Sequence, residues 1–359
     1  MENYIKLPKE LNAIDGHLHV HGIYEKEREM TFIGGHEWYK EECGLKAINI
    51  AALPRSAGNN IVCALYKVAF PKTYAHGCLY YPVRPFEKEI ESFDPLTQYK
   101  ELMEIGFDGI KMLEGKPECY QRSKVPLDNE YYESYFTQIE KDKTHILTHI
   151  NDPAYFWDET KVSQDAKDKG WFYGNGDYLS NLEMYAQMDR LLKKHPNLNM
   201  TLAHFYFRSQ NPEILEEMFK KYPNLAIDIT PGGEMYLDFN KNTEYFHNFF
   251  EKYSEKILFG TDGDFPRGYE AMKWLVDRIY RFLKTDEIVN SFEGVSIKGI
   301  KIGDKHIENI FSNNFIRRVG VSPREINKKA LKKYTEKYLP YVKNKEEYEM
   351  LSSLINKML

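Results

Sequence analysis

Cysteine is scarce in this chain, and no pair of cysteines has the spacing of a metal or redox motif. Only Cys43, Cys63, Cys78 and Cys119 occur among the 359 residues, and no two of them form CxxC. No secretory signal precedes them, so the pattern argues against a disulfide framework. We therefore expect four reduced thiols and a cytoplasmic protein.

Long hydrophobic runs and a charge bias are also missing. No stretch of about 18 or more apolar residues is present, so the sequence predicts no membrane span. The net charge is only −5 and is spread along the chain, which argues against nucleic acid or an anionic membrane as a partner. The composition, with 42% hydrophobic residues, is that of a globular protein. Its length fits one large barrel-type domain or two ordinary domains.

Short apolar runs alternate with amphipathic stretches along most of the chain. Helices are predicted where apolar residues recur at helical spacing, as Leu215, Met218, Phe219 and Tyr222 do. Strands that alternate with helices predict a parallel sheet. The predicted strands are 11–20, 47–53, 77–81, 109–113, 145–150, 199–204, 225–229 and 257–262, and the predicted helices include 95–105, 128–142, 180–195, 211–222, 242–255 and 267–283.

Eight strands followed by helices fit a closed (β/α)₈ barrel, the TIM barrel of the α/β class, which typically has about 250 residues. The alternative is an open, doubly wound sheet. No GxGxxG motif follows the first predicted strand, and polar residues stand at strand ends all along the chain. The sequence therefore favours the barrel.

Two stretches depart from this alternation. Residues 151–180, after the fifth predicted strand, contain seven aromatic residues. A loop of this length is often an active-site lid, although a surface subdomain that packs its own aromatics is the alternative. Beyond Arg324 the chain is Lys-rich and helical. We therefore predict a barrel domain, 1–323, that includes the insertion, and a helical extension, 324–359, that packs outside the barrel or at a homo-oligomer contact.

The stretch from Ile14 to His21 contains three histidines at alternate positions. Residues two apart on a strand point to the same side, so His17 and His19 present two imidazoles in one direction. Neutral imidazoles are common ligands of divalent metals. The alternative is two polar residues at a strand end, and His21 is interpreted as loop or pocket lining.

Other polar residues stand at the ends of later strands: Lys111, His149, His204 and Asp262. Barrel enzymes place their active site at the C-terminal ends of the strands, and closure brings strand 8 beside strand 1. Each residue has an ordinary alternative, such as a buried histidine, a turn former, a strand cap or an ion-pair partner. With His17 and His19, the residues His149 and Asp262 predict a site with three imidazoles, one carboxylate and a position left for water.

These motifs resemble the amidohydrolase superfamily, in particular its amidohydrolase-related (type 2) branch of metal-dependent hydrolases, lactonases and decarboxylases. The resemblance covers most of the chain, from residue 11 to residue 320. Its motifs are specific for the superfamily and say little about the substrate. The matching segments are 14–19, 106–111, 148–149, 202–204, 258–262 and 307–315.

The resemblance implies roles for individual residues. His17, His19, His149 and Asp262 are expected to bind the metal, most simply one Zn²⁺. His204 is expected to face the substrate or to support a ligand. Lys111 is either carbamylated and bridges two metals, or unmodified beside a single metal, and we favour the single metal.

The expected reaction is hydrolysis of a C–N or C–O bond in an amide, lactone or ester of a small, carboxylate-bearing molecule. A bound metal lowers the pKa of water from about 15.7 to about 7. Asp262, His204 and Lys111 form the predicted catalytic set, with Asp262 as the proton carrier and His204 as the group that stabilises the substrate oxygen.

Four further residues are candidates for substrate binding. Arg55 and Arg208 could clamp a substrate carboxylate, and both could equally be surface arginines. Trp157 and Trp171 would contact substrate from the lid. Two other classes of function stay open at this point: a metal-dependent decarboxylase or other lyase, and a non-enzymatic, ligand-binding barrel.

Overall fold

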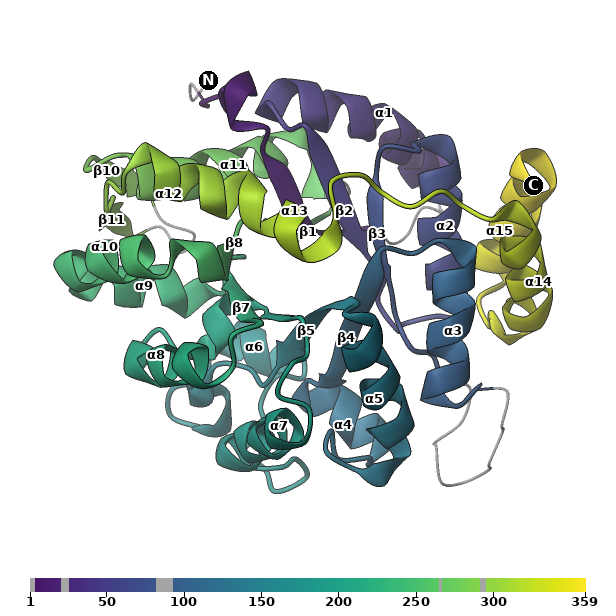
Figure 1. The fold of residues 1–359 in the computed structure, drawn as a ribbon, viewed down its shortest axis with the longest axis horizontal. Helices are drawn as coiled ribbons and strands as arrows, with labels where there is room; N and C mark the ends of the chain where they lie inside the picture. The colour runs from purple at the N-terminus through teal and green to yellow at the C-terminus, as the bar shows by residue number, and fades with distance from the viewer. Residues whose placement is uncertain (1–3, 21–25, 82–92, 265–266, 291–294) are drawn as a thin grey trace.

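The computed structural model describes residues 4–20, 26–81, 93–264, 267–290 and 295–359. A curled parallel sheet lies at its centre and helices surround it (Figure 1). The strands are β1 (Ile14–His19), β2 (Ala47–Ala51), β3 (Tyr74–Gly77), β4 (Gly109–Gly115), β5 (His145–Ile150), β6 (Met200–Leu202), β7 (Leu225–Asp228), β8 (Ile257–Leu258) and β9 (Gly263–Asp264).

The sheet closes on itself. Consecutive strands from β1 to β8 are neighbours and parallel, and β9 pairs with β1 through Leu18 and Gly263. Since β9 follows β8 directly after residues 259–262, the two edges of the sheet are joined by one short piece of chain. The predicted α/β TIM barrel is confirmed.

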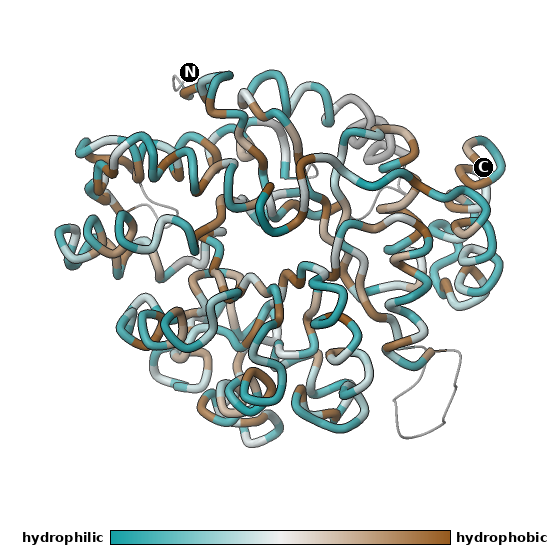
Figure 2. The backbone as a smooth tube through the Cα atoms, in the orientation of Figure 1, coloured by the Kyte–Doolittle hydropathy of each residue, from teal (hydrophilic) through white to brown (hydrophobic). Residues whose placement is uncertain are grey.

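Helices cover the outside of the barrel. Figure 2 shows apolar residues on the strands and on the helix faces turned towards them, which is why nearly every strand residue is buried. The long helices are α1 (Lys26–Cys43), α2 (Asn59–Ala69), α3 (Pro95–Ile105), α5 (Glu133–Asp142), α7 (Asn181–Lys194), α8 (Pro212–Lys221), α9 (Gly233–Lys241), α10 (Thr243–Lys252) and α11 (Tyr269–Lys284). Shorter or later elements are α4 (Pro117–Ser123), α6 (Gln164–Asp168), α12 (Asp304–Glu308), α13 (Asn314–Val319), α14 (Lys328–Tyr338), α15 (Lys345–Met358) and the hairpin of β10 (Ile288–Asn290) and β11 (Ser296–Lys298).

Helix α13 lies over one end of the barrel, on the side of β1, in Figure 1. Phe315 packs there in a small apolar cluster with Ile14 and Tyr74, the first residues of β1 and β3, and with Leu258 of β8. Its ring centroid lies 4.9 Å from that of Tyr74. The opposite end, where the strands finish, is therefore the one at which a site can open.

The structure corrects some boundaries. The third strand was expected at 77–81 and is found at Tyr74–Gly77, because residues 78–81 already form the following loop, where Tyr80 N donates to Gln98 Oε1 at 2.7 Å. The eighth strand stops at Leu258 because the chain turns away before Asp262, whose φ is 50°. The helix expected at 128–142 begins at Glu133. His21 lies outside the described residues.

The C-terminal segment packs beside α2 and α3 at the edge of the barrel (Figure 1). Asn60 Nδ2 donates to Tyr334 Oη at 2.9 Å, and Lys337 Nζ lies 2.7 Å from Glu101 Oε1. These contacts put α14 on the outside of the barrel, one of the two places expected for it. The division into domains 1–323 and 324–359 stays a prediction.

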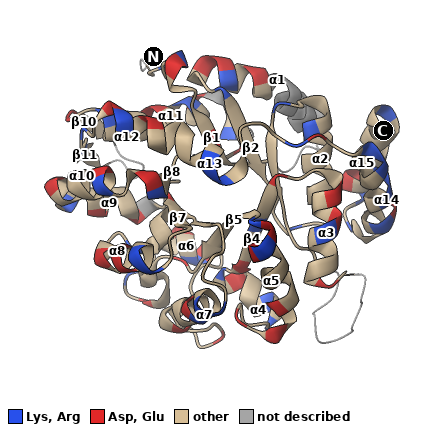
Figure 3. Ribbon diagram, viewed as in Figure 1, with Lys and Arg blue, Asp and Glu red and all other residues tan. Residues whose placement is uncertain are grey.

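In Figure 3, Lys and Arg are interspersed with Asp and Glu along most of the described helices. None of the described helices is long and apolar enough to cross a membrane. The four cysteines are all free thiols, as expected, and three of them are buried.

Candidate metal centre

A cavity of about 530 Å³ opens at the end of the barrel where the strands finish. Its lining includes the four predicted metal ligands and the two other predicted residues of the site: His17, His19, His149, Asp262, His204 and Lys111. The walls come from the ends of β1, β4, β5 and β6, from the loop after β2, from α4 and from the insertion 151–180. The predicted position of the site at strand ends therefore agrees with the fold.

Three candidate ligands converge in this cavity. Among the described residues, His17, His19 and Asp262 form the group whose potential ligand atoms all lie within 4.8 Å of one another. Asp262 Oδ1 lies 3.0 Å from His19 Nε2 and 3.7 Å from His17 Nε2. The backbone holds Asp262 in place, because its N–H donates to His17 O at 2.8 Å. Closure of the barrel thus brings the end of strand 8 to the HxH motif.

The tautomers of both histidines are set by their neighbours. His17 Nδ1 donates to Asp228 Oδ2 at 2.9 Å, and His19 Nδ1 donates to Ala51 O at 2.7 Å. Burial lowers the pKa of His17 to about 3 and also lowers the pKa of His19, so both rings are neutral. Both Nε2 lone pairs therefore point into the cavity.

This donor set fits a divalent cation. His19 Nε2 and Asp262 Oδ1 are both acceptors in these states, and two acceptors 3.0 Å apart repel one another unless a cation or proton lies between them. Two neutral nitrogens and one carboxylate are typical zinc ligands, and their Nδ1 partners give the support such ligands commonly have.

Lys111 lies beside the same group. Its Nζ is 2.8 Å from His17 Nε2, and burial lowers its pKa to about 8. A lysine with a lowered pKa loses its proton more readily near neutral pH, which is a condition for carbamylation or for general-base work.

Asp228 is a functional residue that the sequence reasoning missed. Oδ2 accepts from His17, and Oδ1 accepts from His204 N at 2.8 Å and from the Thr230 hydroxyl. Burial acts to raise its pKa, but the interactions with His17, His204 and Thr230 together lower the pKa to about 2. Its position at the end of β7 was a signal that could have found it, since the same reasoning led to His149 at the end of β5.

His204 faces the cavity with one free nitrogen to offer. Its Nδ1 lies 3.2 Å from Thr230 O and 3.1 Å from Thr230 Oγ1, so only Nε2 can meet a substrate. Its ring centroid lies 5.7 Å from that of His17 and 4.9 Å from that of His149. His204 therefore stands between the metal-binding group and the far wall.

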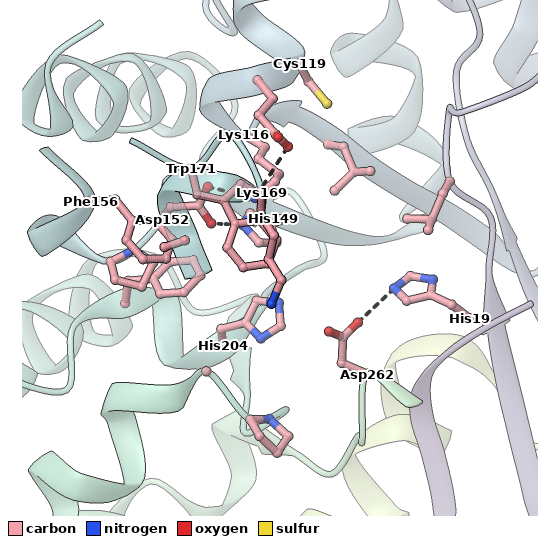
Figure 4. Close-up of a pocket in the computed structure, with 18 of the residues that line it drawn as sticks. His19, Lys116, Cys119, His149, Asp152, Phe156, Lys169, Trp171, His204 and Asp262 are labelled. Carbon is pink, nitrogen blue, oxygen red and sulfur yellow. Dashed lines mark hydrogen bonds and ion pairs between the residues drawn. The ribbon is translucent and has the colours of Figure 1, made fainter. Parts of the chain in front are cut away.

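His149 lies on that far wall. Figure 4 shows it paired with Asp152, away from His19 and Asp262. His149 Nε2 is 3.0 Å from Asp152 Oδ1, and Asp152 also accepts from Lys116 Nζ at 2.7 Å and from the Tyr173 hydroxyl at 2.8 Å. Burial lowers the pKa of His149 to about 4. In this conformation its Nε2 is bound by a carboxylate, and the role of His149 as a fourth ligand stays a prediction.

The four candidates for substrate binding divide into two pairs. Arg55 and Trp171 line the cavity. Arg208 and Trp157 are not among the described residues that line the cavity, so their expected contact with substrate is not supported. Arg208 lies with its guanidinium carbon 3.5 Å from the centre of the Tyr185 ring, and Trp157 donates from Nε1 to Leu179 O at 2.8 Å.

The insertion 151–180 combines both structures that were expected for it. Phe156 and Tyr173 form a small core of its own with Val162 and Ala166, and Trp157 packs against this core. The side that meets the barrel contributes Phe156, Trp171 and other residues to the cavity wall. It is a self-packed subdomain with one face on the cavity.

The chain matches no family model and no curated protein. Among solved structures, 32 chains match it. A "putative amidohydrolase" from Staphylococcus aureus is 14% identical, with 86% of this chain and 99% of that chain covered and a TM-score of 0.53. The 4-oxalomesaconate hydratase LigJ from Rhodopseudomonas palustris is 14% identical, with 86% and 95% covered and a TM-score of 0.51.

An uncharacterized TIM-barrel protein from Bordetella bronchiseptica is also similar, with 14% identity, 85% and 97% coverage and a TM-score of 0.50. Similarity at this level of identity is a similarity of fold. These neighbours include a TIM-barrel protein and a putative amidohydrolase, so the fold that the resemblance implied is confirmed.

Proposed function

We propose that the protein is a metal-dependent hydrolase of the amidohydrolase superfamily that cleaves a C–N or C–O bond in a small, carboxylate-bearing amide, lactone or ester. The observation that supports it most is the convergence of His17 Nε2, His19 Nε2 and Asp262 Oδ1, with both imidazole tautomers fixed from behind. Zinc is the ion that this set of nitrogen and carboxylate ligands suits best.

The residues around the centre have complementary tasks. A bound zinc ion would polarise a carbonyl group and make water acidic enough to supply hydroxide near neutral pH. Asp262 accepts the proton of the attacking water and returns it to the leaving group. His204 presents Nε2 to the substrate, and Arg55 on the cavity wall pairs with a substrate carboxylate.

We favour one metal ion and an unmodified Lys111. Lys111 Nζ occupies the lone pair of His17 Nε2 that a ligand bond requires, so metal binding moves the lysine aside and leaves it to act near the substrate. Metal analysis should give one ion per chain, and reconstitution should not depend on bicarbonate. Two ions per chain with a carbamate would support the binuclear alternative.

A lyase is the second candidate, since the structural neighbours include a hydratase as well as an amidohydrolase. In a decarboxylase the metal binds the substrate and no attacking water is needed. A panel of lactones, esters and N-acyl amino acids, each with and without a second carboxylate, separates the classes when products are assayed for both hydrolysis and carbon dioxide.

The metal assignment is tested with His17→Ala. The variant should lose bound zinc and any activity together, whereas His247→Ala on α10, whose Nδ1 contacts Ile300 O, should keep both. Full zinc occupancy in His17→Ala would contradict the assignment.

A further inference from the structure

The chain leaves β6 through a backbone conformation that non-glycine residues rarely adopt. His204, Phe205, Tyr206 and Phe207 have φ values of 56°, 54°, 56° and 50°. The ψ angle is 23° at Phe205 and 20° at Tyr206, so the segment forms one turn of left-handed helix. A Cβ atom in this conformation approaches the following carbonyl oxygen, and glycine is the residue that avoids the conflict. Strain of this kind concentrates at functional sites.

Contacts with the rest of the molecule keep the turn in place. His204 N donates to Asp228 Oδ1 at 2.8 Å, and Tyr206 O accepts from the Tyr185 hydroxyl at 3.1 Å. Phe205 is fully buried against aromatic side chains of α9 and α10. The two central residues of the turn are therefore anchored in the core.

The first and last residues of the turn, His204 and Phe207, line the cavity. Residues three apart lie on one side of a turn with about three residues per turn, and His204 and Phe207 are related in this way. Their ring centroids are 5.4 Å apart and their planes differ by 30°. The Phe207 ring also lies 5.3 Å from that of His149. One aromatic ring thus contacts two histidines of the cavity.

We propose that the left-handed turn 204–207 is a strained support for Phe207, and that Phe207 is a positioning residue for His149 and His204. Its ring fixes the planes of both imidazoles and keeps water from one side of them. The effect on turnover rests on the function proposed above. The strain and the ring contacts can be tested without a substrate.

The strain is tested with a matched pair of variants. Phe207→Ala and Phe207→Gly both remove the ring, but only glycine accepts a positive φ without strain. Phe207→Gly should unfold about 2 °C above Phe207→Ala. At Asp189, a half-exposed position in the middle of α7, glycine should instead unfold below alanine. A Phe207→Gly protein that melts at or below Phe207→Ala would show that the turn is not strained.

The positioning is tested by NMR of the zinc-loaded protein with labelled histidines. The ring signals of His149 and His204, assigned from the His149→Asn and His204→Asn variants, should shift in Phe207→Ala. They should return towards their original positions in Phe207→Tyr, which keeps a ring. The His247 signal is the internal reference. Unchanged His149 and His204 signals in Phe207→Ala would overturn the proposal, even if the turn proves strained.

Kinetics with the substrate found in the panel above complete the test. Misplaced catalytic groups lower turnover, so kcat should fall by roughly 10²-fold in Phe207→Ala while KM changes little, and Phe207→Tyr should recover most of it. A rise in KM alone would make Phe207 a substrate contact and contradict the positioning role. A failure of the proposed hydrolase function would leave the melting and NMR results intact, so the two failures are distinguishable.

Discussion

Asp228 joins the two parts of the site at the scale of single residues. One of its oxygens accepts from the side chain of His17 and the other from the backbone of His204. Because it fixes the Nδ1–H tautomer of His17, it makes Nε2 available as a lone pair. A carboxylate behind a metal-binding histidine also increases the basicity of that ligand.

The first prediction follows from this contact. Asp228→Asn keeps the size of the side chain but removes the charge and weakens the preference for one tautomer of His17. We expect the affinity for zinc to fall about 10–100-fold, measured by competition with a chelator. Asp238→Asn is the control, because this buried aspartate on α9 accepts from the Ser209 hydroxyl instead. Equal zinc affinity in both variants would mean that Asp228 only supports the fold.

The role of a single residue could be predicted where a short sequence motif contains the metal-binding side chains themselves. The HxH motif and the Gly-Thr-Asp segment gave His17, His19 and Asp262, and the structure brings these three together. Asp228 offered only its position at the end of β7 as a signal, because its contact with His17 joins distant strands. Asp152 is close to His149 in the sequence, but their pairing shows only in the folded structure. His17 and Asp228 are separated by 211 positions in the chain.

Elements were predictable from periodicity, and errors occurred where local sequence and tertiary contacts disagree. The third strand was placed too late because residues 78–81 are apolar, whereas the observed β3 contains the polar His76. That histidine is accommodated inside the barrel by hydrogen bonds to Asn49 and His145 at 2.7 and 2.8 Å. A polar residue in the core depends on partners from other strands, which apolar periodicity cannot reveal.

The insertion 151–180 supplies the second prediction, at the scale of an element. Trp171 lines the cavity, and Lys116 Nζ and Lys169 Nζ lie 5.7 and 5.2 Å from its ring centre. Trp157 instead packs on Tyr173, with ring centroids 4.9 Å apart. Trp171→Ala should raise KM several-fold and leave the melting temperature nearly unchanged. Trp157→Ala should lower the melting temperature by several degrees, because it removes a packed indole.

Steady-state kinetics and thermal unfolding of both variants check this division. Each tryptophan variant is the control for the other, since they lie in the same insertion. Unchanged kinetics in Trp171→Ala towards the true substrate would show that the insertion does not take part in substrate binding.

At the scale of the whole molecule, an apolar cluster and the polar cavity lie at opposite ends of the barrel. The end where the strands begin is filled by α13 and its apolar cluster, and the end where they finish contains the polar cavity.

The C-terminal helices contact a loop that forms part of the cavity wall. Leu351 on α15 is fully buried, and both Leu351 and Glu347 lie against Gly58, in the loop that carries Arg55. The extension therefore supports one wall of the site from outside.

Global stability also depends on a buried carboxyl group outside the cavity. Glu114 lies in β4 with an exposed fraction of 5%, and its Oε2 accepts from the backbone N–H of Leu113 at 2.9 Å. The Tyr81 hydroxyl lies 3.5 Å from the other oxygen. Burial raises its pKa from 4.5 to about 7, against the smaller opposing effect of these hydrogen bonds.

The third prediction concerns the pH dependence that this group imposes. Between about pH 4.5 and pH 7 the folded protein keeps the Glu114 proton that the unfolded chain has lost, so stability falls as the pH rises through this window. Glu114→Gln carries no ionisable proton, so it should melt roughly 5 °C above the wild type at pH 8 and close to it at pH 5. Glu217→Gln, at an exposed position on α8, should change the melting temperature equally at both pH values. A Glu114→Gln effect that is the same at pH 5 and pH 8 would mean that the Glu114 carboxyl group ionises in the folded protein as readily as in the unfolded chain.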